Sequence, residues 1–383
     1  MPDTPQPGSP RWWLDTLYER LLAERDQLDK YDRYHEGKHK LAFATPKFRA
    51  TFGNLFSAFA DNWCPIVVEA ATERMEIQGF RPLGAEEADS EAWDLWKRNF
   101  LDADSNMAIY EAVKMGRSAL IVAPPERGQE YGRITVEHPS QVIVAKAPGD
   151  RRRRSAALKV WLEDTGHLFA TVYLPNAAYR FRSKGTVDAE GALKVEWVER
   201  GDSRHPHEAR HPFGVVPVIP VENAPSMLRG GRSDLDPVIP LNDAVNKLVL
   251  DMIVASEYAA FRQRWATGIE LPTDEEGRPV DEERFLSFVG RVWAVEEPEA
   301  KFGEFGVTDL GNYVGAIGML IEHLSAQTRT PPHYLVGKVQ NVSGDTLKAA
   351  ETGLVSKVRG KLPFMGPAFG EAVSLALPRR VNE

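Results

Sequence analysis

The chain has 383 residues, which is enough for two or three domains, and no apolar run is long enough to span a membrane. Its formal net charge of −8 argues against an ordinary high-affinity nucleic-acid binder. A single cysteine, Cys64, excludes an internal disulfide and a multi-cysteine metal site, and the N-terminus lacks a secretory signal pattern.

The first 230 residues are expected to form a mixed body. Apolar and aromatic residues at helical spacing predict a helical part over 12–116, with segments at about 12–34, 55–74, 90–100 and 105–114. After Ala119 the period changes, and short strands separated by turn residues predict an antiparallel β-rich part over 117–220. The arginine run Arg151–Arg154 is interpreted there as a solvated loop, with phosphate binding as the alternative.

Two long amphipathic helices are predicted beyond this body, within residues 231–261 and 308–330. Their apolar residues recur at spacings of three and four. Ser233 and Asp234 supply a cap and an early carboxylate for the first helix. Pro331-Pro332 prevents the second helix from continuing. A helix from Asp345 to about Arg359 is expected later in the chain.

The segment between the long helices, residues 262–307, is expected to be a small α/β module. Strand-like stretches at 264–270 and 291–295 flank a charged loop. Arginine and tryptophan are favoured at protein interfaces, so four residues of this module are candidate docking residues: Arg262, Arg264, Trp265 and Trp293.

The loop 331–344 is long for a helix connector and combines apolar residues with one cation and several amides. Such a loop can present polar groups to a passing polyanion. Its candidate residues for such a contact are Lys338, Gln340 and Asn341.

The segment His207–His211 matches the pattern H-E-x-x-H. Zinc chemistry needs the two histidines one helical turn apart, with Glu208 beside the bound water. Pro206 and Pro212 bracket the segment, and no third ligand is identified. A zinc hydrolase is therefore the alternative hypothesis. No P-loop or nucleophile elbow is found, so we expect no enzyme activity, no cofactor and no metal.

Several stretches, in order along nearly the whole chain, resemble those of Gp6-like portal proteins of tailed bacteriophages, especially of phages that infect actinobacteria. The stretches are Tyr31–Gly37, Asn62–Arg81, Gly231–Asn242, Pro331–Leu335 and Asn341–Glu351. Their joint order carries the resemblance.

The resemblance implies an α+β portal fold whose parts are ordered along the chain. These parts are a mixed wing (1–230), stem helices (231–261 and 308–330), a small α/β clip (262–307), a tunnel loop (331–344) and a helical C-terminal segment (345–383). The last segment would hold a wing helix and the start of a truncated or minimal crown.

The resemblance also implies a function and a set of partners. The expected assembly is a homododecameric ring at one capsid vertex of the virion, built in the host cytoplasm, through which DNA is packaged and ejected. The clip would dock the large terminase subunit and the head–tail adaptor, and the ring would contact the major capsid protein and scaffold. Double-stranded DNA would pass the tunnel loop without sequence specificity, and no membrane is involved.

Overall fold

The computed structural model describes residues 5–39, 61–187, 195–203, 205–260, 264–267, 299, 301–304, 309–337 and 344–378. The chain divides into two compact units, one formed by Met1–Ala244 with Leu320–Glu383 and the other by Val245–Met319. Helices and antiparallel strands occupy largely separate stretches of the chain, so the predicted α+β class is confirmed. Within the described residues, no helix has the length and apolar character needed to cross a lipid bilayer.

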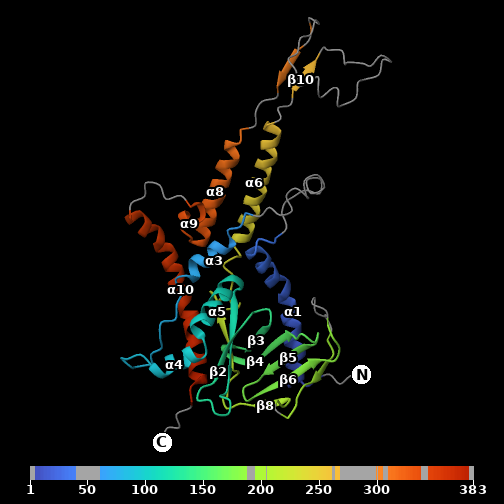
Figure 1. Cartoon of the computed structure of the whole chain (residues 1–383), viewed down its shortest axis with the longest axis vertical. Helices are drawn as coiled ribbons and strands as arrows, with labels where there is room; N and C mark the ends of the chain where they lie inside the picture. Colours follow the sequence, from blue (N-terminus) through green and yellow to red (C-terminus); the bar gives the residue numbers. More distant parts are fainter. Residues whose placement is uncertain are drawn as a thin grey trace, which may run out of the picture. The chain divides into compact units, whose positions relative to one another are not determined.

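The first unit contains most of the secondary structure (Figure 1). Its helices are α1 (Pro10–His35), α3 (Cys64–Thr72), α4 (Ser90–Arg98), α5 (Leu101–Met115), α9 (Pro332–Val336) and α10 (Gly344–Ala376). Its strands are β1 (Arg117–Ala123), β2 (Arg133–Glu137), β3 (Val142–Ala147), β4 (Asp150–Leu162), β5 (Leu168–Tyr173), β6 (Ala177–Ser183), β7 (Trp197–Glu199), β8 (Glu208–Arg210) and β9 (Val218–Glu222). The long helices α6 (Val238–Ala260) and α8 (Gly311–Thr328) belong partly to each unit.

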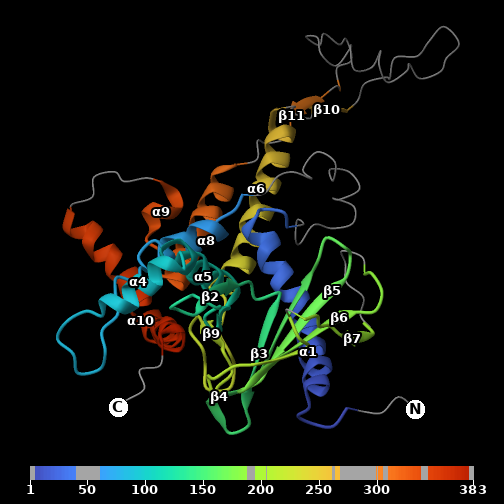
Figure 2. The same ribbon diagram turned by 60° about the horizontal axis from the view of Figure 1, so that its bottom comes forward.

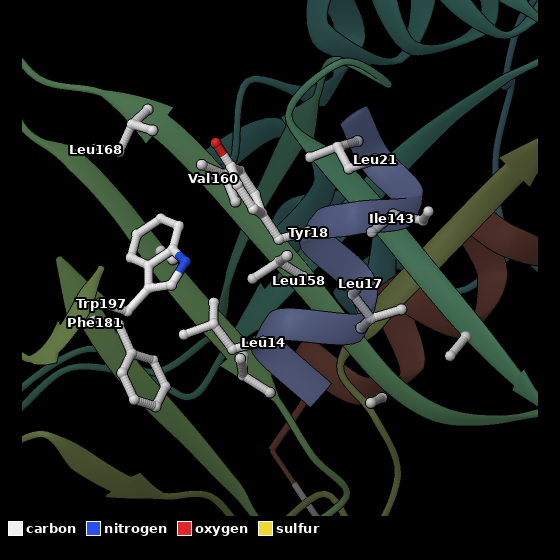
Figure 3. Close-up of a cluster of buried hydrophobic side chains, with 14 residues drawn as sticks. Leu14, Leu17, Tyr18, Leu21, Ile143, Leu158, Val160, Leu168, Phe181 and Trp197 are labelled. Atoms are coloured by element: carbon white, nitrogen blue, oxygen red, sulfur yellow. The ribbon is translucent and has the colours of Figure 1, made fainter. Parts of the chain in front are cut away.

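The larger sheet has the strand order β3-β4-β5-β6-β7, with β8 also paired to β6, and α1 lies across one of its faces (Figure 3). Side chains alternate between the faces of a strand, so Leu158 and Val160 point toward α1. They pack there with Leu14 and Leu17, which are fully buried. Ser9 begins α1 as its N-cap, because its hydroxyl accepts a hydrogen bond from the Trp12 N–H at 3.2 Å.

The smaller sheet has the order β2-β1-β9 and packs against the larger one (Figure 2). Ala119 and Ile121 of β1 meet Val142 of β3 and Ala157 of β4 in a common apolar cluster. Helices α5 and α10 also pack on the small sheet, which explains why β1 is buried on both faces. Because both faces of β1 are covered, its side chains are apolar on both sides, and the sequence shows a continuous apolar run.

Helix α10 is longer than the sequence predicts. The predicted helix ends near Arg359, whereas α10 continues to Ala376 through two internal prolines, Pro363 and Pro367. An internal proline removes a helical hydrogen bond and costs about 3 kcal/mol. Burial of the second half outweighs this cost: Met365, Phe369, Ala372, Val373 and Ala376 are all at most 3% exposed. Tertiary packing therefore overrides the proline signal.

Other local predictions are corrected in the same way. The run Arg151–Arg154 is not a loop but lies in strand β4, which pairs with β3 and β5. The loop predicted over 331–344 begins with the short helix α9, and its residues 338–343 lie outside the described residues. Within the segment predicted over 55–74, the described helix is α3, and Pro65 occupies its first turn, where proline is tolerated.

The second unit contains the last part of α6, the first part of α8, and the antiparallel strands β10 (Arg264–Thr267) and β11 (Lys301–Glu304). The long helices predicted within 231–261 and 308–330 are thus confirmed as helices. Strand β10 falls inside the predicted stretch 264–270, while 291–295 lies outside the described residues.

Two glycines make the closest backbone approach in the first unit. Gly116 ends α5 with a φ of 94°, in the left-handed region that glycine favours. The connector from β9 to α6 passes directly over it, and a Cβ added to Gly231 would lie 1.8 Å from the Gly116 carbonyl oxygen. Any side chain at position 231 therefore forces the two backbones apart.

We expect Gly231→Ala to lower the free energy of unfolding by about 2–3 kcal/mol, because the added methyl group must displace backbone atoms. Gly230→Ala is the matched control, since its Cβ would meet only the end of the Glu222 side chain at 3.3 Å. That control should change stability by less than about 0.5 kcal/mol. Urea unfolding followed by tryptophan fluorescence measures both, and equal effects would contradict the close approach.

Candidate functional site

The site residues predicted from the sequence fall mainly outside the described part of the chain. The predicted DNA-facing residues lie outside it: Lys338, Gln340 and Asn341. So do two predicted docking residues, Arg262 and Trp293. The other two, Arg264 and Trp265, begin β10 and stand opposite Glu304 and Gly303 of β11. The roles of all seven residues stay predictions.

The H-E-x-x-H segment forms strand β8 instead of a helical turn. A strand rises about 3.3 Å per residue, so a spacing of four residues separates His207 and His211 by roughly 13 Å, too far to share an ion. Each imidazole already contacts a backbone carbonyl: His207 Nδ1 lies 2.7 Å from the Arg180 oxygen, and His211 Nε2 lies 3.0 Å from the Leu174 oxygen. The zinc-hydrolase alternative thus loses its geometric basis.

The described residues instead converge on a buried ionic cluster where α6 begins, which we call the root network. It consists of Asn223, Asp234, Thr328, Lys357 and Lys361. Lys361 Nζ donates to Asp234 Oδ1 at 2.6 Å and to Asn223 Oδ1 at 2.6 Å. Lys357 Nζ lies 2.7 Å from Asp234 Oδ2 and donates to the Thr328 carbonyl at 2.9 Å. The network joins the end of β9, the start of α6, the end of α8 and the middle of α10.

The electrostatics of the root network follow from its burial. The side chains of Asp234 and Lys361 are only 9% and 5% exposed. Burial by itself raises the pKa of a carboxyl, but the ammonium groups of Lys357 and Lys361 outweigh it and hold the pKa of Asp234 below its ordinary value. Burial also lowers the pKa of Lys361, and Lys357 adds to this effect. One carboxylate is thus shared between two neighbouring cations in a place with little water.

Two tyrosines near the end of α1 hold the first turns of α6. Tyr31 donates a hydrogen bond to Asp236 at 2.5 Å, and Tyr34 donates to both carboxylate oxygens of Asp243 at 2.9 and 3.0 Å. Burial and the bond to Asp236 raise the pKa of Tyr31 to about 12, so it stays a donor at neutral pH. The paired tyrosines of the sequence pattern are therefore attachment points for α6.

Helix α9 is fixed by a second polar cluster within the same unit. Arg74, just after α3, donates to Tyr334 Oη at 2.5 Å and to Glu351 of α10 at 3.0 Å. His333 Nε2 lies 3.2 Å from the other oxygen of Glu351. The Trp63 indole N–H donates to the carbonyl of Leu335 at 3.3 Å. These contacts attach α9 to both α3 and α10.

Sequence reasoning missed the root network, apart from Asp234. Ser233 and Asp234 are predicted to cap α6, but α6 begins only at Val238, after a turn, and Asp234 points into the ionic cluster instead. A signal was present in α10. Lys357 and Lys361 are four residues apart on the same side of the helix as the buried Leu354. Two cations among apolar core positions indicate a buried acidic partner.

The comparisons with known proteins identify the family. Residues 14–378 match a family model described as phage portal protein, SPP1 Gp6-like. The chain belongs to this portal family. The portal proteins of Mycobacterium phages D29 and L5 are 30% and 29% identical to it over 325 residues. These alignments cover 81% of the chain but 63% of each relative, so this portal-family chain spans less than two thirds of their length.

The predicted resemblance to Gp6-like portal proteins, including those of actinobacteriophages, is thereby confirmed. Among solved structures, the neck of a native GTA particle computed with C12 symmetry aligns with 88% of this chain and 82% of that one. The sequence identity is 11% and the TM-score is 0.47.

We expect Asp234→Asn to lower the free energy of unfolding at pH 7 by about 3–5 kcal/mol, because it leaves two buried ammonium groups without a counter-charge. The stabilisation by Asp234 is complete above the ordinary carboxyl pKa of about 4 and is lost as the pH falls through its lower folded-state value. The variant should therefore lose less stability than the wild type between pH 5 and pH 2.

Urea unfolding over this pH range measures both effects. Asp15→Asn is the control, because Asp15 and its partner Arg11 are 45% and 40% exposed. Exposed pairs contribute at most about 1 kcal/mol. If the free energy of unfolding fell equally for the wild type and Asp234→Asn between pH 5 and pH 2, another carboxyl group would control the pH dependence.

Proposed function

We propose that this chain assembles into a homododecameric ring at one capsid vertex of the virion and forms the conduit for DNA packaging and ejection. The portal family is a structural one, which supports a role without catalysis. In this proposal residues 1–230 form the wing, 231–261 and 308–330 the stem, 262–307 the clip, and 331–344 the tunnel loop.

The observation that carries the proposal is the exposure of α8 in the single chain. Val314 and Met319, both on this apolar helix, are 61% and 50% exposed. No described atom lies within 4 Å of a Cβ added to Gly315 or Gly318. Glycine inside a helix costs up to about 1 kcal/mol relative to alanine, and nothing described in the chain uses the space it leaves. Both features suit a helix packed closely against a neighbouring copy.

A ring uses one heterologous interface repeatedly until it closes, so such unpartnered apolar surface is needed on every copy. The net charge of −8 per chain makes the assembled ring strongly acidic. An acidic lumen repels phosphate, which suits a conduit that must release its cargo. Lys338, Gln340 and Asn341 would be the few groups that touch the passing double-stranded DNA.

The proposed partners are the large terminase subunit and the head–tail adaptor at the clip, with the major capsid protein and scaffold around the wing. The proposed docking residues of the clip are Arg262, Arg264, Trp265 and Trp293. Assembly in the host cytoplasm belongs to the same proposal.

Negative-stain imaging of the purified full chain should show rings with a central hole, and metal analysis should find no stoichiometric zinc. Val314→Asp should convert rings into smaller species on size exclusion, because it places a charge in the interface between copies. Asn312→Asp is the matched control on the same helix, at an exposed position where an acid suits the first turn. Compact zinc-containing monomers of the wild type would contradict the proposal.

Deletion of residues 270–285 should leave rings intact and abolish binding of the large terminase subunit, because the deletion removes the charged loop of the proposed clip. Pull-down of the terminase subunit on immobilised rings measures this. Undiminished binding by the deletion variant would place the docking surface elsewhere.

A further inference from the structure

The loop before α4 is an isolated acidic projection. Residues 81–88, which we call the acidic loop, are all exposed. They include Glu86 and Glu87, one cation, Arg81, at the start of the loop, and a fully exposed Leu83. Its base is closed by a backbone hydrogen bond of 2.8 Å from the Asp89 N–H to the Phe80 carbonyl. Figures 1 and 2 show the loop, in cyan, projecting from the rest of the first unit. An apolar side chain is thus held in water beside two carboxylates.

The base of the acidic loop is packed firmly. The Phe80 ring lies 5.2 Å from the Trp96 ring, and Trp96 is 1% exposed. Trp96 in turn meets Phe369 of α10 edge-on at 5.8 Å. The loop therefore projects from a fixed aromatic base, and its exposed leucine has no role in the core of its own chain.

A hollow of opposite character lies beside the β3–β4 hairpin. This basic hollow has a volume of about 720 Å³, and its lining includes Trp13, Arg152, Arg153, Pro175 and Val215. Val215 is 41% exposed although it is apolar. The hollow therefore combines guanidinium groups with an apolar floor.

The lining of the basic hollow carries one excess positive charge, from three arginines and two carboxylates. Arg154 is neutralised, because it donates to both oxygens of Glu371 at 2.5 and 3.1 Å and to the Val216 carbonyl at 3.1 Å. Arg152 and Arg153 are exposed, and their guanidinium groups have no ion-pair partner among the described residues. Asp150 contributes one carboxylate to the lining. A net positive charge remains for an incoming acidic segment.

We propose that the acidic loop of one copy docks into the basic hollow of the next copy in the ring. Leu83 would rest on Trp13 and Val215, while Glu86 and Glu87 face Arg152 and Arg153. The inference rests on the proposed function, since it needs copies that meet through a repeated heterologous contact.

Two observations favour a second copy over a nucleic acid as the occupant. The hollow has an apolar floor, which a sugar–phosphate backbone does not use but which matches Leu83. Every chain also carries both complementary surfaces, and its own loop, being wholly exposed, does not fill its own hollow. Charge complementarity between them fixes the register of neighbouring copies.

Site-directed cross-linking tests the contact in the full chain. The natural cysteine, Cys64, is fully buried, and burial raises its thiol pKa to about 12, so it does not compete for a maleimide. Leu83→Cys combined with Val215→Cys, treated with a short bismaleimide, should give a ladder of covalent oligomers on a denaturing gel. Leu83→Cys combined with Leu162→Cys is the control and should give no ladder. Leu162 is 45% exposed, but it lies at the end of β4 away from the basic hollow.

Charge reversal tests the chemistry of the contact. In the cross-linking variant, Glu86→Arg with Glu87→Arg should reduce the ladder roughly tenfold, and Arg152→Glu with Arg153→Glu should do the same. Combining all four reversals should restore it, which a general loss of folding cannot do.

Rings that give no ladder, or a ladder that ignores the reversals, overturn this inference and leave the proposed function standing. It is also overturned if the arginine reversals abolish binding of a DNA duplex without affecting the ladder, since the hollow is then a nucleic-acid surface. A chain that images only as monomers refutes the proposed function, and this inference falls with it.

Discussion

The first unit depends on one buried carboxylate. Asp234 is held between Lys357 and Lys361, and the same cluster takes in Asn223 and the carbonyl of Thr328. These groups come from four segments of the chain, and all four must be in place for each buried charge to have its partner. A buried ion pair is weak as a source of stability but strict about geometry, because a misplaced partner leaves a charge without water or counter-ion. The cluster thus specifies where α6 starts and α8 ends.

Around this cluster, apolar packing stabilises the fold, and polar contacts fix the position of the start of α6. The face of α1 that carries Leu14 and Leu17 is buried against the large sheet. Near the other end of the helix, Tyr31 reaches Asp236 just before α6, and Tyr34 reaches Asp243 within it. One helix therefore joins the β-rich core to the start of a long helix. Such a frame fits the proposed stem, which in the proposed function keeps its alignment while DNA moves past it.

The fold class and the long helices could be predicted from the sequence because their signals are local. Apolar spacing over α6 and α8 is visible in any window of the chain. The errors arose where distant packing decides. Helix α10 continues past Pro363 because its second half is buried, and the arginine run lies in β4, where Arg154 pairs with Lys146 of β3. His207 and His211 matched a motif whose helical context is absent.

The candidate site was harder to predict for the same reason. Asp234 and Lys361 meet only through the folded chain, and each has an ordinary local role as a helix-start acid or a helical lysine. The family resemblance was easier to detect, because it rests on the order of short segments along the sequence, such as Tyr31–Gly37, and not on contacts between distant residues. The residues that would meet DNA or the packaging motor were assigned from local composition together with that resemblance.

The exposed apolar side of α8 has a thermodynamic consequence. Val314 and Met319 gain no burial from the described part of their own chain, and Gly315 and Gly318 weaken the helix they belong to. If copies pack against α8 as proposed, folding of this segment and association of the copies become linked equilibria. The stability of the second unit would then rise with the concentration of the chain.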